Sequence, residues 1–97
     1  MKWLLNQQLY DSTKATLIAS WSNGLSYKDP SFEEENLYKT NAGAFFLVGN
    51  RLSVAGQSAS IDDKCLPLTK QRSLEWCQKR HQPEAAAEHL TEILIIA

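Results

Sequence analysis

The sequence predicts one α+β domain, residues 1–97, built around a small antiparallel sheet. Two pairs of short apolar runs, each joined by two or three turn-forming residues, are typical of β-hairpins. Three further segments carry apolar residues at helical spacing. We expect a sheet made from the two hairpins, packed by one helix from the N-terminal half and two C-terminal helices. With 97 residues and 43% hydrophobic residues, the chain can build one core of this kind.

The first hairpin is expected within the first ten residues. The apolar runs 3–5 and 9–10 flank Asn6 and Gln7. This pair is a weaker turn signal than Asn-Gly, because glutamine disfavours a positive φ.

A helix is expected from Lys14 to Ser22. Residues 11–13 offer side-chain oxygens for its N-cap, and Asn23 and Gly24 should end it. Its apolar stripe would comprise Leu17, Ile18 and Trp21. An irregular loop should then run over residues 25–33.

The second hairpin has the clearest signal in the chain. The runs 36–40 and 44–48 flank residues 41–43, a connection that ends in glycine and suits a turn with a glycine bulge. The run 44–48 is apolar at every position, which predicts a central strand with both faces covered.

The C-terminal half should contain a loop, an extended segment and two helices. Residues 49–60 are mostly small and polar and predict a loop, and 64–68 should be extended because Pro67 keeps its predecessor from the α region. Thr69 should cap a helix through Lys79. A last helix should begin near Pro83, with this apolar face: Ala85, Ala86, Ala87, Leu90, Ile93 and Leu94.

The charge pattern argues against a protein built to bind nucleic acid. The formal net charge is −1, and lysines and arginines are scattered along the chain. The densest charge run is acidic and comprises Glu33, Glu34 and Glu35. A nucleic-acid-binding regulator remains the alternative, through a local patch of Lys70, Arg72, Lys79 and Arg80. No apolar stretch is long enough for a membrane span, so we expect a cytoplasmic protein without membrane contact.

Catalytic and metal-binding patterns are weak. The sequence contains none of the common phosphate-binding, zinc-protease or serine-hydrolase motifs. A zinc site could nominally use Cys65, Cys77, His81 and His89, but the ligands lack paired spacing. Cys77 and His81 stand one helical turn apart, although a buried thiol and a helix-ending histidine explain them better. We therefore expect no enzyme, no cofactor and no metal, and we expect Trp3, Trp21 and Trp76 in the core.

Several strings give the chain a resemblance to a protein family. Residues 9–13 read LYDST and residues 21–24 WSNG. Residues 34–47 read EENLYKTNAGAFFL, and PLT at 67–69 is followed by EW at 75–76. These strings resemble small uncharacterised bacterial proteins of plasmids, integrated elements and phage-like regions, over most of the chain. Family members have Asn-Gly in the first turn and a glycine-rich stretch after the second strand, where this chain has Asn6-Gln7 and residues 48–51.

The resemblance implies a small accessory protein of a mobile element and brings no catalytic residues. We expect a protein-binding module, such as an anti-CRISPR-type inhibitor of host defence that occludes a basic nucleic-acid-binding surface of a defence complex. The predicted contacts are the acidic run Glu33, Glu34 and Glu35 with three aromatic anchors, Tyr27, Phe32 and Tyr38. The apolar segment 93–96 also predicts a homodimer through the C-terminal helix.

Overall fold

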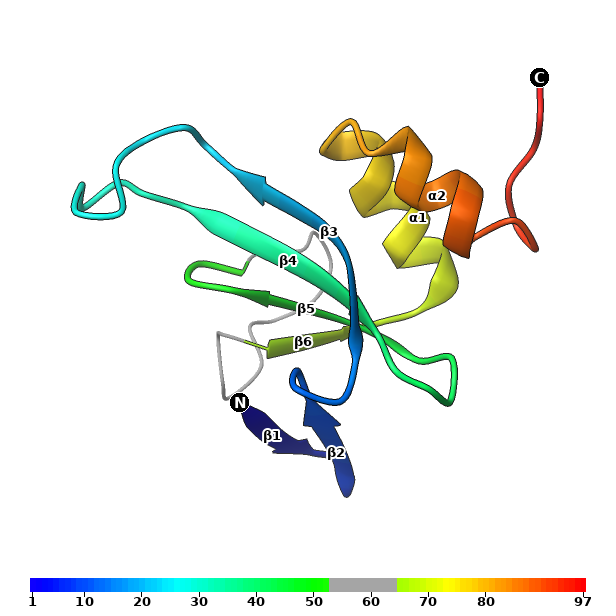
Figure 1. The fold of residues 1–97 in the computed structure, drawn as a ribbon, viewed down its shortest axis with the longest axis horizontal. Helices are drawn as coiled ribbons and strands as arrows, with labels where there is room; N and C mark the ends of the chain where they lie inside the picture. The colour runs from blue at the N-terminus through cyan, green and yellow to red at the C-terminus, as the bar shows by residue number, and fades with distance from the viewer. Residues whose placement is uncertain (53–64) are drawn as a thin grey trace.

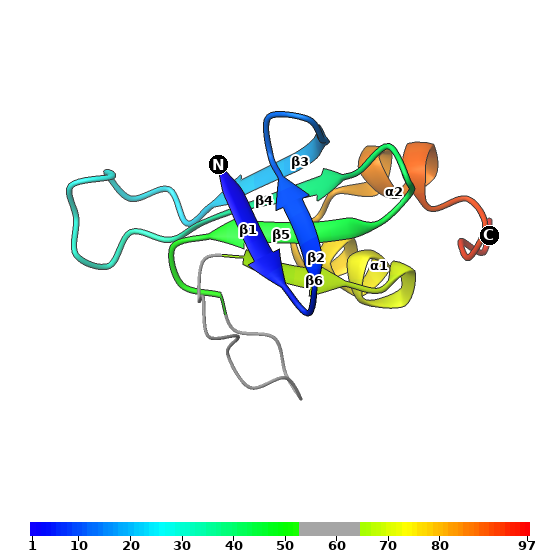
Figure 2. The same cartoon turned by 90° about the horizontal axis from the view of Figure 1, so that it is seen from below.

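The protein is built in three layers, with a four-stranded sheet between a β-hairpin and a pair of helices (Figures 1 and 2). The computed structural model describes residues 1–52 and 65–97. An α+β fold with small antiparallel sheets is therefore confirmed. The arrangement of the elements differs from the prediction in three respects, which concern the first hairpin, the segment before residue 22 and the last helix.

The central sheet has the strand order β3-β4-β5-β6, and every neighbouring pair is antiparallel. Its strands are β3 (Thr16–Ser22), β4 (Glu34–Lys39), β5 (Phe45–Gly49) and β6 (Cys65–Leu68). On one face, Leu37, Leu47 and Leu66 form a row across three strands and contact the helices. On the other face, Phe46 contacts the hairpin. Strand β5 is thus covered on both sides, as its uniformly apolar sequence predicts.

The segment 14–22 is not a helix, because residues 16–22 form strand β3 at an edge of the sheet. A β-bulge shifts the pairing between Leu17 and Ala19, so Ile18 is an extra residue. Consequently Ile18 and Ala19, although adjacent, both pack against the helix-side core, together with Trp21. A bulge inserts one residue into the alternation of a strand, and here it produces an apolar spacing that imitates a helix.

The first hairpin is confirmed, but it forms a separate two-stranded sheet. Strands β1 (Lys2–Leu5) and β2 (Gln8–Asp11) meet at Asn6 and Gln7, whose φ angles are 50° and 66°. The hairpin lies across the face of the central sheet (Figure 2). Trp3 and Tyr10 are directly paired and pack on Phe46, with ring centroids 6.3 and 5.3 Å away.

The helix layer follows β6 without a long connection. Helix α1 (Lys70–Lys79) begins at Thr69, whose hydroxyl accepts a hydrogen bond from the Arg72 amide at 3.1 Å. Helix α2 (Pro83–His89) starts at the expected proline but is shorter than predicted. Residues 93–97 lie beyond it and are not helical. The β-branched isoleucines of this segment have low helix propensity, which is consistent with an end at Leu90.

The predicted loop 49–60 lies mostly outside the described residues, because only 49–52 of it are described. Within the described part of the chain, no helix is long and apolar enough to cross a membrane.

Candidate partner-binding surfaces

A loop over residues 23–33 connects β3 to β4 and projects beyond the end of the sheet (Figure 1). Two asparagines secure it. The Asn23 side-chain amide donates to the Ser31 carbonyl at 2.8 Å, and the Asn50 amide donates to the Phe32 carbonyl at 2.7 Å. The Asn50 side-chain oxygen also accepts from the Glu34 amide at 2.9 Å. Asn23 therefore bridges the loop internally, and Asn50, which follows β5, holds its base from outside.

Gly49 permits this arrangement at the end of β5. A Cβ atom at this position would lie only 2.6 Å from the Glu34 carbonyl oxygen, so no larger residue fits. The close approach lets the following residues reach across to the loop. Besides Asn50, the Arg51 guanidinium donates to the Pro30 carbonyl.

Asp29 fixes the loop from within. Its carboxylate accepts a hydrogen bond from the Ser31 amide at 2.8 Å, and its carbonyl accepts from the Phe32 amide at 2.9 Å. The Asp29 amide in turn donates to the Ser26 carbonyl at 2.9 Å. A loop with this many internal bonds has lost much of its conformational freedom before any partner binds.

The loop displays apolar side chains to solvent. Tyr27 is 76% exposed and Leu25 43%, whereas Phe32 is half-buried near the base. The Lys28 ammonium lies 5.7 Å from the centre of the Tyr27 ring. The Tyr27 side chain therefore faces solvent and does not pack in the core, which is the position expected of an interface anchor.

The three consecutive glutamates do not share one surface. Glu34 is exposed and Glu33 half-buried, but Glu35 is only 6% exposed, because alternate residues of β4 face opposite sides of the sheet. One oxygen of Glu35 accepts from the Trp76 indole at 3.0 Å and from Arg80 Nε at 2.8 Å. The Arg80 guanidinium stacks on Trp21 at 3.4 Å. Glu35 thus joins the sheet to α1 and is not available as a surface contact.

Tyr38 lies apart from the loop. Its ring is half-buried and stacks on Phe46 at 5.2 Å, on the hairpin side of the sheet. Of the six predicted contact residues, four therefore belong to the loop and its base: Tyr27, Phe32, Glu33 and Glu34. Glu35 and Tyr38 contribute to the two interfaces between layers.

Asp11 is a mostly buried carboxylate at the end of β2. One oxygen accepts from the Thr13 hydroxyl at 2.6 Å and amide at 3.0 Å. Its other oxygen is buried without a hydrogen-bond partner among the described residues. The Thr13 hydroxyl bond lowers the pKa of Asp11, with Lys2 adding to the effect. The carboxylate shapes the turn between hairpin and sheet.

The cysteines lie on opposite faces of the sheet. Cys65 is buried with Trp3 and Tyr10 beneath the hairpin, whereas Cys77 is buried in the helix-side core. Burial raises the pKa of Cys77, which disfavours the reactive thiolate. Across the ranges 1–52 and 65–97, no cluster of three or more Asp, Glu, His or Cys side chains could hold a metal ion.

Three of the four basic residues of the predicted nucleic-acid patch take part in ion pairs. Lys70 contacts Glu92 at 2.6 Å, Arg72 lies 3.9 Å from Glu75, and Arg80 is bound to Glu35. The Lys70 contact lowers the pKa of Glu92. Cations paired in this way offer less free positive charge to a phosphate backbone.

The sequence-based prediction missed an apolar groove between the two helices and the segment 93–97. Its volume is about 750 Å³. The apolar run 93–96 was the available signal, but it predicted a longer helix. The groove depends on the chain leaving the helix at Leu90 and turning back, with the Ile93 amide bonded to the Leu90 carbonyl.

No family model, no curated protein and no solved structure matches this chain significantly.

Proposed function

We propose that this chain is a non-enzymatic protein-binding accessory protein and that the 23–33 loop contacts its partner. The observation that carries the proposal is the exposure of Tyr27 on a loop fixed by its own hydrogen bonds. Binding through a preorganised loop avoids much of the entropy cost of ordering it. Tyrosine offers a large contact area with few rotatable bonds, which makes it a frequent anchor.

The charges around the loop favour a basic partner surface. Asp29, Glu33 and Glu34 are all solvent-accessible and lie in or beside the loop. Lys28 and Arg51 offset part of this charge, and Arg51 is engaged with the Pro30 carbonyl. The acidic side chains would speed association with a positively charged partner and set its orientation.

The resemblance to mobile-element proteins supports a role as an inhibitor of host defence. In an anti-CRISPR-type mechanism, the loop would occlude a basic surface of a defence complex that otherwise binds nucleic acid. The ion pairs of Lys70, Arg72 and Arg80 favour this protein-binding role over direct nucleic-acid binding.

The test is affinity capture with the wild-type chain and two variants. We expect the wild-type chain and Leu4→Ser to capture the same host protein, and Tyr27→Ser to lose it. Leu4 is a matched control because it is 73% exposed but lies on the hairpin. With the captured protein purified, Tyr27→Ser should raise the dissociation constant roughly tenfold or more. Equal binding by Tyr27→Ser and wild type would contradict the assignment of the loop.

The anti-defence role has its own assay. Expression of the chain in bacteria with active CRISPR interference should restore plaque formation by a targeted phage, and Tyr27→Ser should not. If wild type leaves interference unchanged while the captured partner still binds, protein binding stands and the anti-defence role does not.

A further inference from the structure

The groove between the helices is apolar at its floor and uncharged at its rim. Seven apolar residues from α1, α2 and the following segment line it: Leu74, Cys77, Pro83, Ala86, Ile93, Leu94 and Ile95. The polar residues around them are three glutamines and a histidine, namely Gln71, Gln78, Gln82 and His81. Among the described residues, no lysine, arginine, aspartate or glutamate contributes to the lining. The groove therefore suits an apolar segment rather than a charged ligand.

The segment 93–97, called the tail below, carries a matching apolar surface. Ile93 and Leu94 are half-buried and pack on the helix-side core. Ile95 and Ile96, which follow directly, are 91% and 80% exposed. Ile95 also stands at the rim of the groove. Two exposed apolar side chains, Ile95 and Ile96, thus lie next to an open apolar groove.

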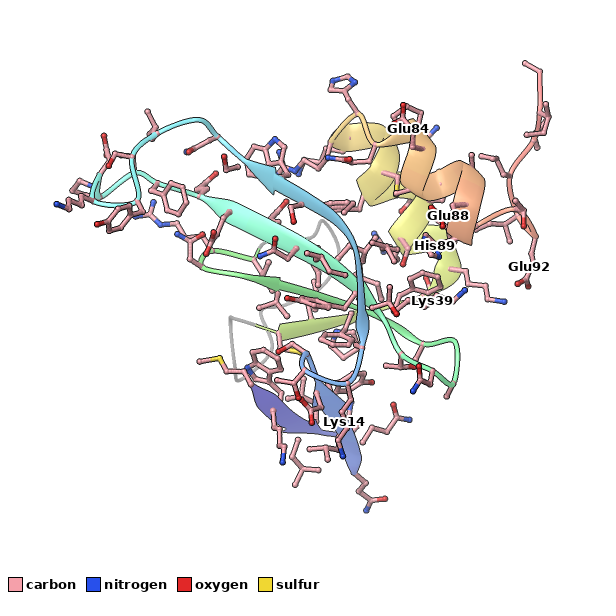
Figure 3. The ribbon with its side chains drawn as sticks, in the orientation of Figure 1. Lys14, Lys39, Glu84, Glu88, His89 and Glu92 are labelled. Atoms are coloured by element: carbon pink, nitrogen blue, oxygen red, sulfur yellow. The ribbon has the colours of Figure 1, made fainter. Side chains whose placement is uncertain are left out.

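Charge is segregated between the two sides of the groove. Residues 69–80 contain four basic side chains and one acidic one, whereas residues 81–97 contain three acidic side chains and no lysine or arginine. The acidic residues Glu84, Glu88 and Glu92 follow one another along α2 and the start of the segment after it (Figure 3). The pair between Lys70 and Glu92 shows that the two sides attract each other within one chain.

We propose that a second copy of this chain occupies the groove, so that each copy inserts Ile95 and Ile96 into the groove of the other. In a two-fold symmetric dimer, both tails are buried and both grooves are filled at once. Lys79, which takes part in none of the ion pairs described above, is exposed, as are Glu84 and Glu88, so this patch carries accessible charge of both signs and can pair with a second copy of itself. The proposal does not rest on the 23–33 loop, which lies at the other end of the molecule (Figure 1).

The first test measures the mass of the protein in solution over a range of concentrations. We expect sedimentation equilibrium to show a monomer–dimer equilibrium for wild type. The double variant Ile95→Asp/Ile96→Asp should raise the dimer dissociation constant by about tenfold or more, since it removes two apolar side chains from the contact. The matched control is Leu4→Asp/Leu9→Asp, which alters the exposed cross-strand pair of the hairpin and should leave the constant unchanged.

The second test distinguishes reciprocal exchange from any other dimer. Gln78→Trp should block the groove while leaving the tail intact, and the exposed position of Gln78 spares the core. For the mixing experiment the tail variant is Ile96→Asp alone, because Ile95 lines the groove of its own chain. The groove variant and the tail variant should each be mostly monomeric when measured alone. An equal mixture of Gln78→Trp with Ile96→Asp should form heterodimers, because one intact tail can enter one intact groove. Native mass spectrometry resolves the two chains by mass.

Three results would overturn the proposal. Wild type could remain monomeric at high micromolar concentration, the control variant could weaken the dimer as much as the tail variant, or the mixture could show no heterodimer. Thermal unfolding of each variant checks that the fold is retained.

Discussion

Glu34 and Glu35 are adjacent in β4, yet Glu35 has a structural role and Glu34 is available for recognition. The Glu35 carboxylate accepts from Trp76 and Arg80 inside the molecule, while the preceding Glu34 faces solvent. The run of three glutamates correctly predicts accessible acidic side chains at Glu33 and Glu34. It could not predict the burial of Glu35, because its partners lie 41 and 45 residues away in the sequence.

Replacing Glu35 should therefore affect stability rather than binding. Glu35→Ala leaves the Arg80 guanidinium and the Trp76 indole without their shared acceptor, so the free energy of unfolding should fall by about 3 kcal/mol. Glu34→Ala is the neighbouring control and should change it by less than about 0.5 kcal/mol. Urea titration followed by tryptophan fluorescence measures both. Equal stabilities of the two variants would show that the buried pair contributes nothing.

Helix and strand boundaries could be predicted from the sequence where a single residue determines them. The glycine before β5, the threonine cap of α1 and the proline at the start of α2 each fix an element boundary through their own backbone geometry or hydrogen bonds. Strand β3 was not predictable, since its bulge imitates helical spacing and its pairing with β4 is set by residues far along the chain. The end of α2 and the groove beside it likewise depend on tertiary packing.

The turn of the first hairpin offers a stabilising substitution. Gln7 adopts a φ of 66°, which glycine adopts without steric cost. Gln7→Gly should raise the free energy of unfolding by about 0.5–1 kcal/mol. Gln8→Gly, one position later in β2, should lower it by at least as much, because it weakens a strand and removes the acceptor of the Tyr10 hydroxyl. Thermal denaturation of both variants gives the comparison, and a loss of stability in Gln7→Gly would contradict the strain argument.

At the scale of the whole molecule, the central sheet divides the core in two. Phe46 anchors the hairpin side, and Leu37 and Leu47 anchor the helix side. A two-stranded hairpin alone is marginally stable, so β1 and β2 depend on the contacts of Trp3 and Tyr10 with Phe46. We therefore expect the two interfaces between layers to open separately.

The two thiols make this separation measurable. Trp3→Ala should loosen the hairpin and speed alkylation of Cys65 more than that of Cys77. Leu90→Ala, on the helix side, should speed alkylation of Cys77 more than that of Cys65. Timed alkylation under native conditions, read by peptide mass spectrometry, gives both rates. If each variant accelerated both cysteines equally, the layers would be opening together.

The position of the 23–33 loop relative to the tail determines how many partner molecules a dimer could bind. The two features lie at opposite ends of the molecule, whose longest extent is 39 Å. A dimer joined through its tails would hold its two 23–33 loops far apart. Such a particle would bridge two target molecules, or two copies of a site on one assembly, with an avidity that neither loop has alone.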